Sequence, residues 1–240
     1  MKRSSYYNNL IPKKYLSSLS KKNLTRNCKN IISNIELDVD TPNNIFHSLS
    51  KKFKLNFKLS DLLKFKKFKT VAIIGMGGSI LGADAIYNFF QSKIKKKFIF
   101  LDDIDENKIL NLKKNYNVKN ILFLIISKSG NTLETLSNFF SLNIIKKNSK
   151  NIIIISEKSN NFLFQISKRL NLFHVESRKY IGGRYSVLSE TGLLPAYLMG
   201  INITKFRKNL LKHFSKKNKP YLIDSCLKLA NLIHKNKFKN

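Results

Sequence analysis

Cysteine, acidic residues, glycine and long apolar runs are all scarce in this 240-residue chain. The two cysteines, Cys28 and Cys226, are too few for a disulfide framework or a zinc site, so reduced thiols are expected. The longest apolar runs, such as 121–126, are far shorter than the roughly 20 residues of a membrane-spanning helix. Residues 1–9 carry charge without an apolar stretch behind them, unlike a secretory signal. These absences predict a cytoplasmic protein that does not associate with membranes.

The shortage of acidic residues gives the chain a formal net charge of +31, with 45 basic residues against 14 acidic ones. Such a balance ordinarily points to nucleic-acid binding. Lysine, however, supplies 39 of the 45 basic residues and is spread along the whole chain. Nucleic-acid binders depend more on arginine, whose planar fork contacts bases and phosphates bidentately. The lysine accompanies abundant Asn, Ile and Phe, which also have A/T-rich codons, so genomic composition is the favoured explanation. Nucleic-acid binding therefore stays the less favoured alternative, and we expect no nucleic-acid partner.

The few glycines are concentrated in one part of the chain. All nine lie between residues 75 and 200, and seven fall in three clusters, at 75–82, 127–132 and 182–186. Each cluster follows an apolar run typical of a strand and includes Ser, Thr, Lys or Arg. Glycine lets the backbone approach a ligand closely or adopt positive φ, so the clusters predict an anion site.

From Thr70 onward, short apolar runs alternate with longer amphipathic segments, as in repeated strand–helix units. Strands are expected at 70–75, 97–102, 120–126, 151–155 and 171–175. Helices are expected between them at 79–92, 105–115, 132–146 and 159–169. Two of the strand runs are apolar on both faces, which a strand covered by helices on both sides requires. The predicted fold is therefore α/β, a three-layer α/β/α sandwich with a five-stranded parallel sheet and flanking helices.

The flanking regions are expected to be helical. Residues 1–69 contain no glycine and are interpreted as a helical lead-in, with a soft boundary near residue 70. The sheet domain is then expected over 70–200, and a helical segment over 201–240. Within these last two parts, helices are expected at 186–199, 203–214 and 221–235.

The first cluster joins a strand to a helix that starts near Ser79. Its N–H groups and the positive end of the helix then face the carboxyl edge of the sheet, where phosphate is the natural ligand. A dinucleotide fold is the alternative, because Asp102 and Asp103 end the next strand. The G-x-G-x-x-G spacing from Gly75 nevertheless places Ile80 where the third glycine belongs. This cluster alone leaves nucleotide and sugar phosphate equally open.

The second cluster places three hydroxyl groups and Lys128 within six residues, before a helix that carries Glu134. Hydroxyl and N–H groups at a helix start can bind phosphate with neutral donors and little need for metal. An ordinary helix cap would explain Thr132 and Glu134 but not the whole run.

The third cluster places Arg184 directly after a glycine pair. Only six arginines occur in the chain, so an arginine here suggests a need for a planar, permanently charged group. A surface turn is the alternative.

The three clusters together resemble the glucose-6-phosphate isomerase family. The matching runs are Gly-Met-Gly-Gly-Ser-Ile-Leu-Gly at 75–82, Ser-Lys-Ser-Gly-Asn-Thr-Leu-Glu-Thr at 127–135, and Gly-Gly-Arg-Tyr-Ser-Val-Leu-Ser-Glu-Thr-Gly-Leu-Leu-Pro-Ala at 182–196. They occur in the family's order. The third run is the most specific, whereas sugar-isomerase (SIS) domains in general share looser forms of the first two.

The resemblance implies a SIS fold. It also implies an enzyme that interconverts glucose 6-phosphate and fructose 6-phosphate through a cis-enediolate, without metal or other cofactor. Arg184 would stabilise the enediolate oxygen, and Glu134 would support the site electrostatically. The substrate, mainly its phosphate, would be surrounded by Gly78, Ser79, Ser127, Lys128, Ser129 and Thr132.

Members of this family have two SIS domains, and their proton-transferring glutamate, ring-opening histidine and late lysine follow the first domain. The chain is therefore expected to be the N-terminal part of a complete isomerase, inactive alone and homodimeric at full length. The lone histidines are expected to be structural rather than catalytic: His47, His174, His213 and His234. A sugar-phosphate-binding SIS module without catalysis is the alternative function.

Overall fold

The computed structural model describes residues 18–234, and positions 1–17 and 235–240 lie outside that range. Contacts divide the chain into two compact units, residues 53–208 and residues 1–52 with 209–240. The domain boundaries expected from the sequence, at 70 and 200, stay a prediction.

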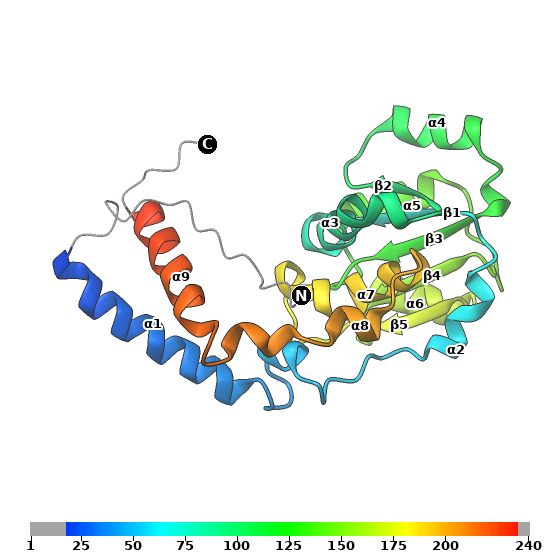
Figure 1. The fold of residues 1–240 in the computed structure, drawn as a ribbon. Helices are drawn as coiled ribbons and strands as arrows, with labels where there is room; N and C mark the ends of the chain where they lie inside the picture. Colours follow the sequence, from blue (N-terminus) through cyan, green and yellow to red (C-terminus); the bar gives the residue numbers. More distant parts are fainter. Residues whose placement is uncertain (1–17, 235–240) are drawn as a thin grey trace. The chain divides into compact units, whose positions relative to one another are not determined.

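The larger unit is built on a five-stranded parallel sheet (Figure 1). Its strands are β1 (Thr70–Gly75), β2 (Lys97–Leu101), β3 (Ile121–Ile126), β4 (Ile152–Ser156) and β5 (Phe173–Glu176). Their spatial order is β2-β1-β3-β4-β5, so the order reverses at β1 and β3. Ligands bind at such a reversal in open α/β sheets, outside the carboxyl ends of the strands. The predicted five-stranded parallel sheet is confirmed.

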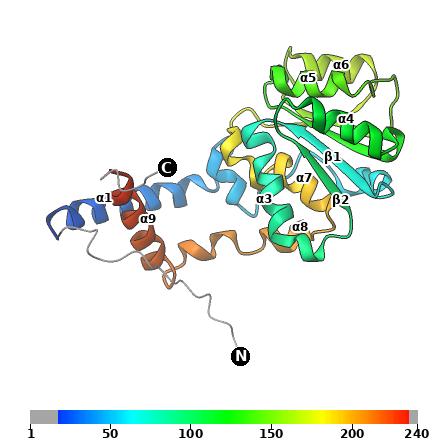
Figure 2. The same ribbon diagram turned by 90° about the horizontal axis from the view of Figure 1, so that it is seen from above.

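Helices cover both faces of this sheet, as Figure 2 shows from above. One face carries α3 (Leu81–Phe90), α7 (Glu190–Leu198) and α8 (Ile203–Arg207). The other carries α4 (Glu106–Asn115), α5 (Leu133–Ser141) and α6 (Phe162–Arg169). Before the sheet, α2 (Leu59–Leu62) continues into a 3-10 turn (Leu63–Phe65). Further 3-10 turns occupy Gly77–Ser79, Gln91–Lys93, Val118–Asn120 and Gly183–Leu188.

The sheet separates two apolar cores, and alternate residues of each strand supply them. Val71 and Ile73 face the core beneath α3 and α7, whereas Ala72 and Ile74 face the core beneath α4, α5 and α6. Every residue of β3 is buried, which explains why its sequence is apolar without alternation. The three-layer α/β/α sandwich is therefore confirmed.

Three predicted helices differ from those in the structure. The helix expected over 132–146 ends at Ser141, shortly before Asn143 adopts a left-handed φ of 51°. The helix expected over 186–199 is divided, because Ser189 is extended between a 3-10 turn and α7. The segment 203–214 is likewise divided into α8 and a 3-10 turn (Leu210–Phe214), with a break at Asn209.

The smaller unit contains α1 (Ser18–Asp38), a 3-10 turn (Ile45–Leu49) and α9 (Lys219–His234). Its buried apolar cluster is small and joins α1 to α9 through Ile32, Ile223 and Leu227. The Nζ atom of Lys219 lies 2.7 Å from Glu36 Oε2 between the same helices. Of the lead-in predicted over 1–69, residues 1–17 lie outside the described residues. Across residues 18–234, none of the helices combines the length and apolarity needed to cross a membrane.

Candidate functional site

The first and second glycine clusters begin side by side at the carboxyl edge of the sheet. They follow β1 and β3, which are hydrogen-bonded neighbours with Gly75 in register with Ile126. The contact between them is close, because a Cβ on Gly75 would lie 2.9 Å from the carbonyl oxygen of Ile126. The parallel register therefore brings 75–82 and 127–132 to the same edge.

The third cluster touches the first through backbone atoms. A Cβ added to Gly78 would overlap the backbone of Gly183, so only glycine fits there without movement. The hydroxyl of Ser186 donates to the carbonyl oxygens of Gly183, at 2.7 Å, and Gly78, at 3.2 Å. Val187 also packs against Gly82, where an added Cβ would lie 3.0 Å from the valine Cβ. All three clusters therefore meet along one edge of the sheet.

Three hydroxyl groups converge within the second cluster. The oxygens of Ser127 and Thr132 are 2.8 Å apart, and the Ser129 oxygen is 3.5 Å from each of them. The Gly130 N–H donates to the Ser127 oxygen at 3.2 Å from a left-handed φ of 69°. Ser127 is buried, whereas Ser129 is exposed, so the three hydroxyl groups lie in a turn that is open to solvent on one side. Such a set of short donors is suited to the oxygens of a phosphate.

Thr132 occupies the N-cap position of α5, but its side chain makes no capping hydrogen bond. Its hydroxyl is directed to Ser127 instead. The helix-cap alternative therefore does not explain the Thr132 side chain. It does account for Glu134, which is half-buried in the first turn of α5, where a negative charge interacts favourably with the helix dipole.

The Lys128 side chain points away from the three hydroxyl groups of the second cluster. Its Nζ donates to the carbonyl oxygen of Lys179 at 2.7 Å and lies 3.6 Å from Glu157 Oε1. The ammonium group thus joins the second cluster to the segment that follows β5.

The side chains of Arg184 and Glu134 make no hydrogen bond or ion pair with another residue in the described part of the chain. Arg184 is exposed in the 3-10 turn that begins at Gly183, and Gly78 and Ser79 beside it are half-buried. Its guanidinium group is therefore available to a ligand at the carboxyl edge of the sheet.

Two further residues fix the second cluster and were not identified from the sequence. The carboxamide of Asn161 caps α6 and occupies the space beside Gly130, where an added Cβ would overlap it. The carboxamide oxygen of Asn131 accepts from the Phe162 N–H at 2.9 Å. Asn161 precedes a helical pattern, so its capping role has a sequence signal, but its contact with Gly130 has none.

A buried carboxylate beneath the third cluster was also missed. Glu190 is 1% exposed, and its Oε1 accepts from the Asn56 N–H at 2.9 Å and lies 3.4 Å from Arg178 Nε. Its Oε2 has no hydrogen-bond partner among the described residues. Burial raises the pKa of Glu190, and the Asn56 N–H and the Arg178 guanidinium act against that rise. The scarcity of arginine, which singled out Arg184, applies equally to Arg178 and could have identified this pair.

Residues 21–230 match the family model described as phosphoglucose isomerase. The chain belongs to the phosphoglucose isomerase family. That membership confirms the resemblance found in the sequence.

Curated relatives of this chain are similar over part of their length. A probable glucose-6-phosphate isomerase from Methanococcus maripaludis is 36% identical over 148 residues, which cover 58% of this chain and 34% of the relative. A glucose-6-phosphate isomerase from Acholeplasma laidlawii is 34% identical over 186 residues, which cover 69% of this chain and 43% of the relative. The chain spans about a third of the length of the curated relatives it matches.

Solved structures show the same fold. A hypothetical protein from Thermus thermophilus superposes with a TM-score of 0.66 at 22% identity, covering 92% of this chain and 56% of that protein. A glucose-6-phosphate isomerase from Chlamydia trachomatis superposes with a TM-score of 0.59 at 19% identity, covering 78% of this chain and 43% of that enzyme.

Proposed function

We propose that this phosphoglucose isomerase chain supplies the sugar-phosphate-binding edge of an enzyme that interconverts glucose 6-phosphate and fructose 6-phosphate. The observation that carries the proposal is the convergence of three hydroxyl groups beside the contact between Gly78 and Gly183. Convergent neutral donors at the start of α5, with an exposed arginine on the same edge, suit a ligand with a phosphate at one end and a reacting oxygen at the other.

The phosphate is proposed to bind the hydroxyl groups of Ser127, Ser129 and Thr132. Their present hydrogen bonds run among themselves, so a phosphate can accept these protons without uncovering a buried donor. The backbone of Gly78 and the side chain of Ser79 are proposed to complete the cradle from the first cluster. Lys128 would contact phosphate only after its ammonium group leaves the Lys179 carbonyl oxygen.

Arg184 is proposed to stabilise the reaction intermediate. Aldose–ketose exchange removes a proton from the carbon beside the carbonyl group and leaves negative charge on the oxygens of a cis-enediolate. A permanently charged guanidinium group can pair with that charge without titrating. Glu134, half-buried in the first turn of α5, would tune the electrostatics of the same edge. We extend the proposal to a homodimer at full length, located in the cytoplasm and without a nucleic-acid partner.

Ligand binding tests the proposed phosphate site. Fructose 6-phosphate or 6-phosphogluconate, at about 100 times its Kd, should stabilise the chain by about 2.7 kcal/mol and raise its melting temperature by about 5 °C or more. The double variant Ser127→Ala with Thr132→Ala should lose this shift. A double variant at exposed positions outside the clusters, Ser92→Ala with Thr204→Ala, is the matched control. No shift with millimolar ligand, or an equal shift in both double variants, would contradict the proposal.

Turnover of the full-length protein tests the proposed role of Arg184. Arg184→Ala should lower kcat by about 10²- to 10³-fold with little change in substrate affinity, because the proposed interaction forms mainly in the transition state. Arg184→Lys, which keeps the charge but loses the planar fork, should recover only part of the rate. A wild-type rate in Arg184→Ala would exclude the role. Sugar-phosphate binding without any turnover would favour the alternative of a non-catalytic SIS module.

A further inference from the structure

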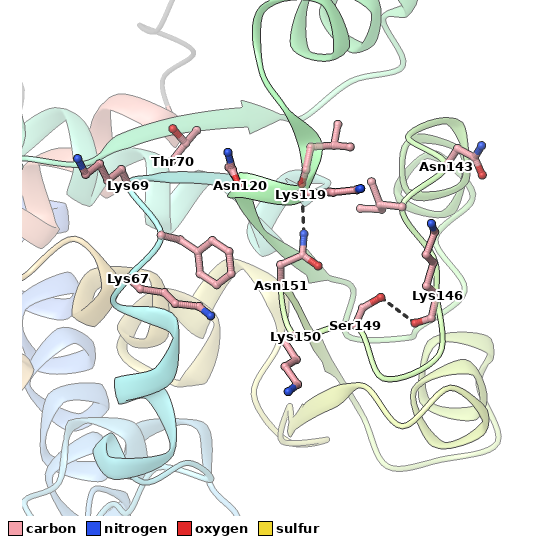
Figure 3. Close-up of a pocket in the computed structure, with 13 residues that line it drawn as sticks. Lys67, Lys69, Thr70, Lys119, Asn120, Asn143, Lys146, Ser149, Lys150 and Asn151 are labelled. Atoms are coloured by element: carbon pink, nitrogen blue, oxygen red, sulfur yellow. Dashed lines mark hydrogen bonds between the residues drawn. The ribbon is translucent and has the colours of Figure 1, made fainter.

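A second hollow lies at the amino edge of the same sheet, away from the three glycine clusters. It has a volume of about 700 Å³ and is shown in Figure 3. It forms where the chain enters β1 at Thr70, β3 after Asn120 and β4 after Asn151. The first two glycine clusters follow the opposite ends of β1 and β3, so the two sites use opposite edges of one sheet.

The lining of this hollow is strongly basic. Lysine supplies five of its thirteen residues and neither Asp nor Glu is among them, so the charge inside has one sign. The lysines are Lys67, Lys69, Lys119, Lys146 and Lys150. In Figure 3 the Lys67 and Lys119 side chains project toward the loop that carries Lys146 and Lys150. We call these five residues the lysine pocket.

The ammonium groups of the lysine pocket have no counter-charge among the residues that the structure describes. Within residues 18–234, none of the five ammonium groups makes an ion pair or a hydrogen bond. The Nζ of Lys67 lies 5.4 Å from the centre of the Phe68 ring. Lys108 differs, because its Nζ lies 2.7 Å from Asp103 and 3.1 Å from Asp102. Like charges gathered in a concave surface raise the local potential and attract anions from solution.

The backbone beneath the lysine pocket is held in place by asparagines. The Asn151 carboxamide donates to the carbonyl oxygens of Val118, at 3.2 Å, and Ile121, at 2.9 Å, which ties β4 to the start of β3. Asn143 and Asn148 adopt left-handed φ values of 51° and 59° in the loop before β4. The Ser149 hydroxyl closes the same loop by donating to the Lys146 carbonyl oxygen at 2.7 Å. The lysines therefore project from a fixed frame, which suits a binding site.

A neighbouring hollow of about 840 Å³ extends the basic surface. It shares Lys67, Ser149 and Lys150 with the lining of the first hollow and adds Lys64 and His174. Its lining also lacks Asp and Glu. The Nζ of Lys64 lies over the ring of Phe173 at 4.6 Å, so this ammonium group is held at the wall of the second hollow.

We propose that the lysine pocket binds a small ligand with two or more phosphate groups, of the class of inorganic triphosphate or a nucleoside triphosphate. The Lys69 side chain points away from the other lysines in Figure 3, and the remaining four still exceed the charge of a single phosphate, so an oligophosphate matches them better. The volume is that of a small-molecule site. The one aromatic residue in the lining, Phe68, is buried and offers no face on which the bases of single-stranded nucleic acid could stack.

Calorimetric titration at low salt tests the proposal with three probes: inorganic triphosphate, ATP and orthophosphate. Triphosphate should bind, orthophosphate should bind at least about tenfold more weakly, and added salt should weaken both. ATP binding tighter than triphosphate would assign the ligand to nucleotides, and equal binding would assign it to the phosphate chain alone. Absence of triphosphate binding at millimolar concentration would overturn the proposal.

Matched lysine variants separate the pocket from the high charge of the whole chain. The triple variant Lys119→Gln, Lys146→Gln and Lys150→Gln should weaken triphosphate binding by about tenfold or more. The control triple variant changes the same net charge at exposed positions outside the pocket, with Lys58→Gln, Lys205→Gln and Lys208→Gln, and should stay within about twofold of wild type. Equal losses in both would show diffuse attraction and would reject the pocket.

The remaining controls locate the bound anion. Triphosphate should still bind the Ser127→Ala, Thr132→Ala variant, and a loss there would place the anion at the glycine clusters and reject the lysine pocket. Failure of fructose 6-phosphate to bind would leave this result standing, so the two proposals fail separately. Single-stranded RNA that binds more tightly than triphosphate, and is lost in the same pocket variant, would replace the small ligand with nucleic acid and overturn the proposal.

Discussion

A single buried carboxylate lies beneath the segment that carries Arg184. Glu190 is held between the Asn56 N–H and the guanidinium group of Arg178. Arg178 in turn donates to Asn56 Oδ1 at 3.0 Å and to the Lys54 carbonyl oxygen, and its guanidinium lies over the Phe53 ring. The chain segment before the sheet is thereby tied to the segment after β5. The Glu190 side chain is 1% exposed and that of Arg178 is 22% exposed, so removal of the carboxylate leaves a largely buried cation without its counter-charge.

Glu190→Ala should therefore lower the free energy of unfolding by about 3 kcal/mol. Urea unfolding followed by circular dichroism measures this change. Lys158→Ala, which breaks an exposed pair with Glu176 at 3.3 Å, is the control and should cost about 1 kcal/mol or less. Equal losses in the two variants would show that the buried pair adds nothing beyond a surface ion pair.

His174 should make stability depend on pH. Burial lowers its pKa to about 4, with the Lys158 ammonium acting in the same direction, and its Nε2 lies 2.9 Å from the Ser156 hydroxyl. The unfolded chain, with an ordinary histidine pKa near 6.5, takes up this proton first. The free energy of unfolding should therefore fall as pH drops from about 6.5 toward 4.

The partly exposed ring limits the size of the His174 effect to about 1 kcal/mol. The free energy of unfolding of wild type and of His174→Gln is measured across this pH range. The difference between the two proteins isolates the contribution of His174, because carboxylates titrate in both. The variant should lose less stability than wild type on acidification. Parallel curves for the two proteins would exclude the role of His174.

At the scale of elements, the decisive contact joins two turns that come from opposite ends of the domain. The 3-10 turn after β1 and the 3-10 turn that begins at Gly183 meet at Gly78, where backbone atoms of the second turn fill the space of a Cβ. The contact is asymmetric. A Cβ on Gly183 would find its nearest neighbour at an ordinary 3.8 Å.

Gly78→Ala should therefore separate the two turns, with a loss of about 1–3 kcal/mol in the free energy of unfolding. If the proposed function holds, it should also weaken fructose 6-phosphate binding. Gly183→Ala is the matched control and should stay close to wild type in both measurements. Thermal unfolding and calorimetry check the pair, and similar behaviour of the two variants would show that the contact is not tight.

At the scale of the whole molecule, the two compact units differ in the amount of apolar surface they bury. The unit of residues 53–208 has a core on each face of its sheet, whereas α1 and α9 share three buried apolar residues within the described chain. Burial of apolar area is the main source of stability, so local unfolding should differ between the units.

Native-state hydrogen exchange should reveal this difference. Amides of β3 and β4, where every residue is buried, should be the most protected, and those of α1 and α9 should exchange much faster. Mass spectrometry of peptides from each unit measures the rates. Equal protection of α1 and β3 would show that the chain unfolds as one cooperative body.

Much of the fold was predictable because the strands have a local signature. The run at 70–75 coincides with β1, and the apolar run at 121–126 coincides with β3, since a strand buried on both faces consists mainly of apolar residues. Helix ends were less predictable. The end of α5 and the break at Ser189 depend on Asn143 and on hydrogen bonds of the Ser189 hydroxyl, which compete with a helical pattern that continues in the sequence.

The candidate site was predictable only within each cluster. Ser127, Ser129 and Thr132 lie within six residues, so one turn suffices to bring their hydroxyl groups together. The scarcity of arginine could have drawn attention to Arg178, but nothing in the sequence around Glu190 indicates that it is buried, because an acidic residue in the first turn of a helix is ordinarily exposed and stabilised by the helix dipole.

The sequence by itself determined the parallel sheet, its two covered faces and the position of the first two glycine clusters at strand ends, because periodicity and apolar content act over a few neighbouring residues. Only the tertiary structure decided that Gly78 touches Gly183, that Glu190 is buried and that five lysines surround one hollow at the amino edge. These contacts join segments far apart in the chain. The packing of helices against the sheet selects such contacts, and no local pattern of residues encodes them.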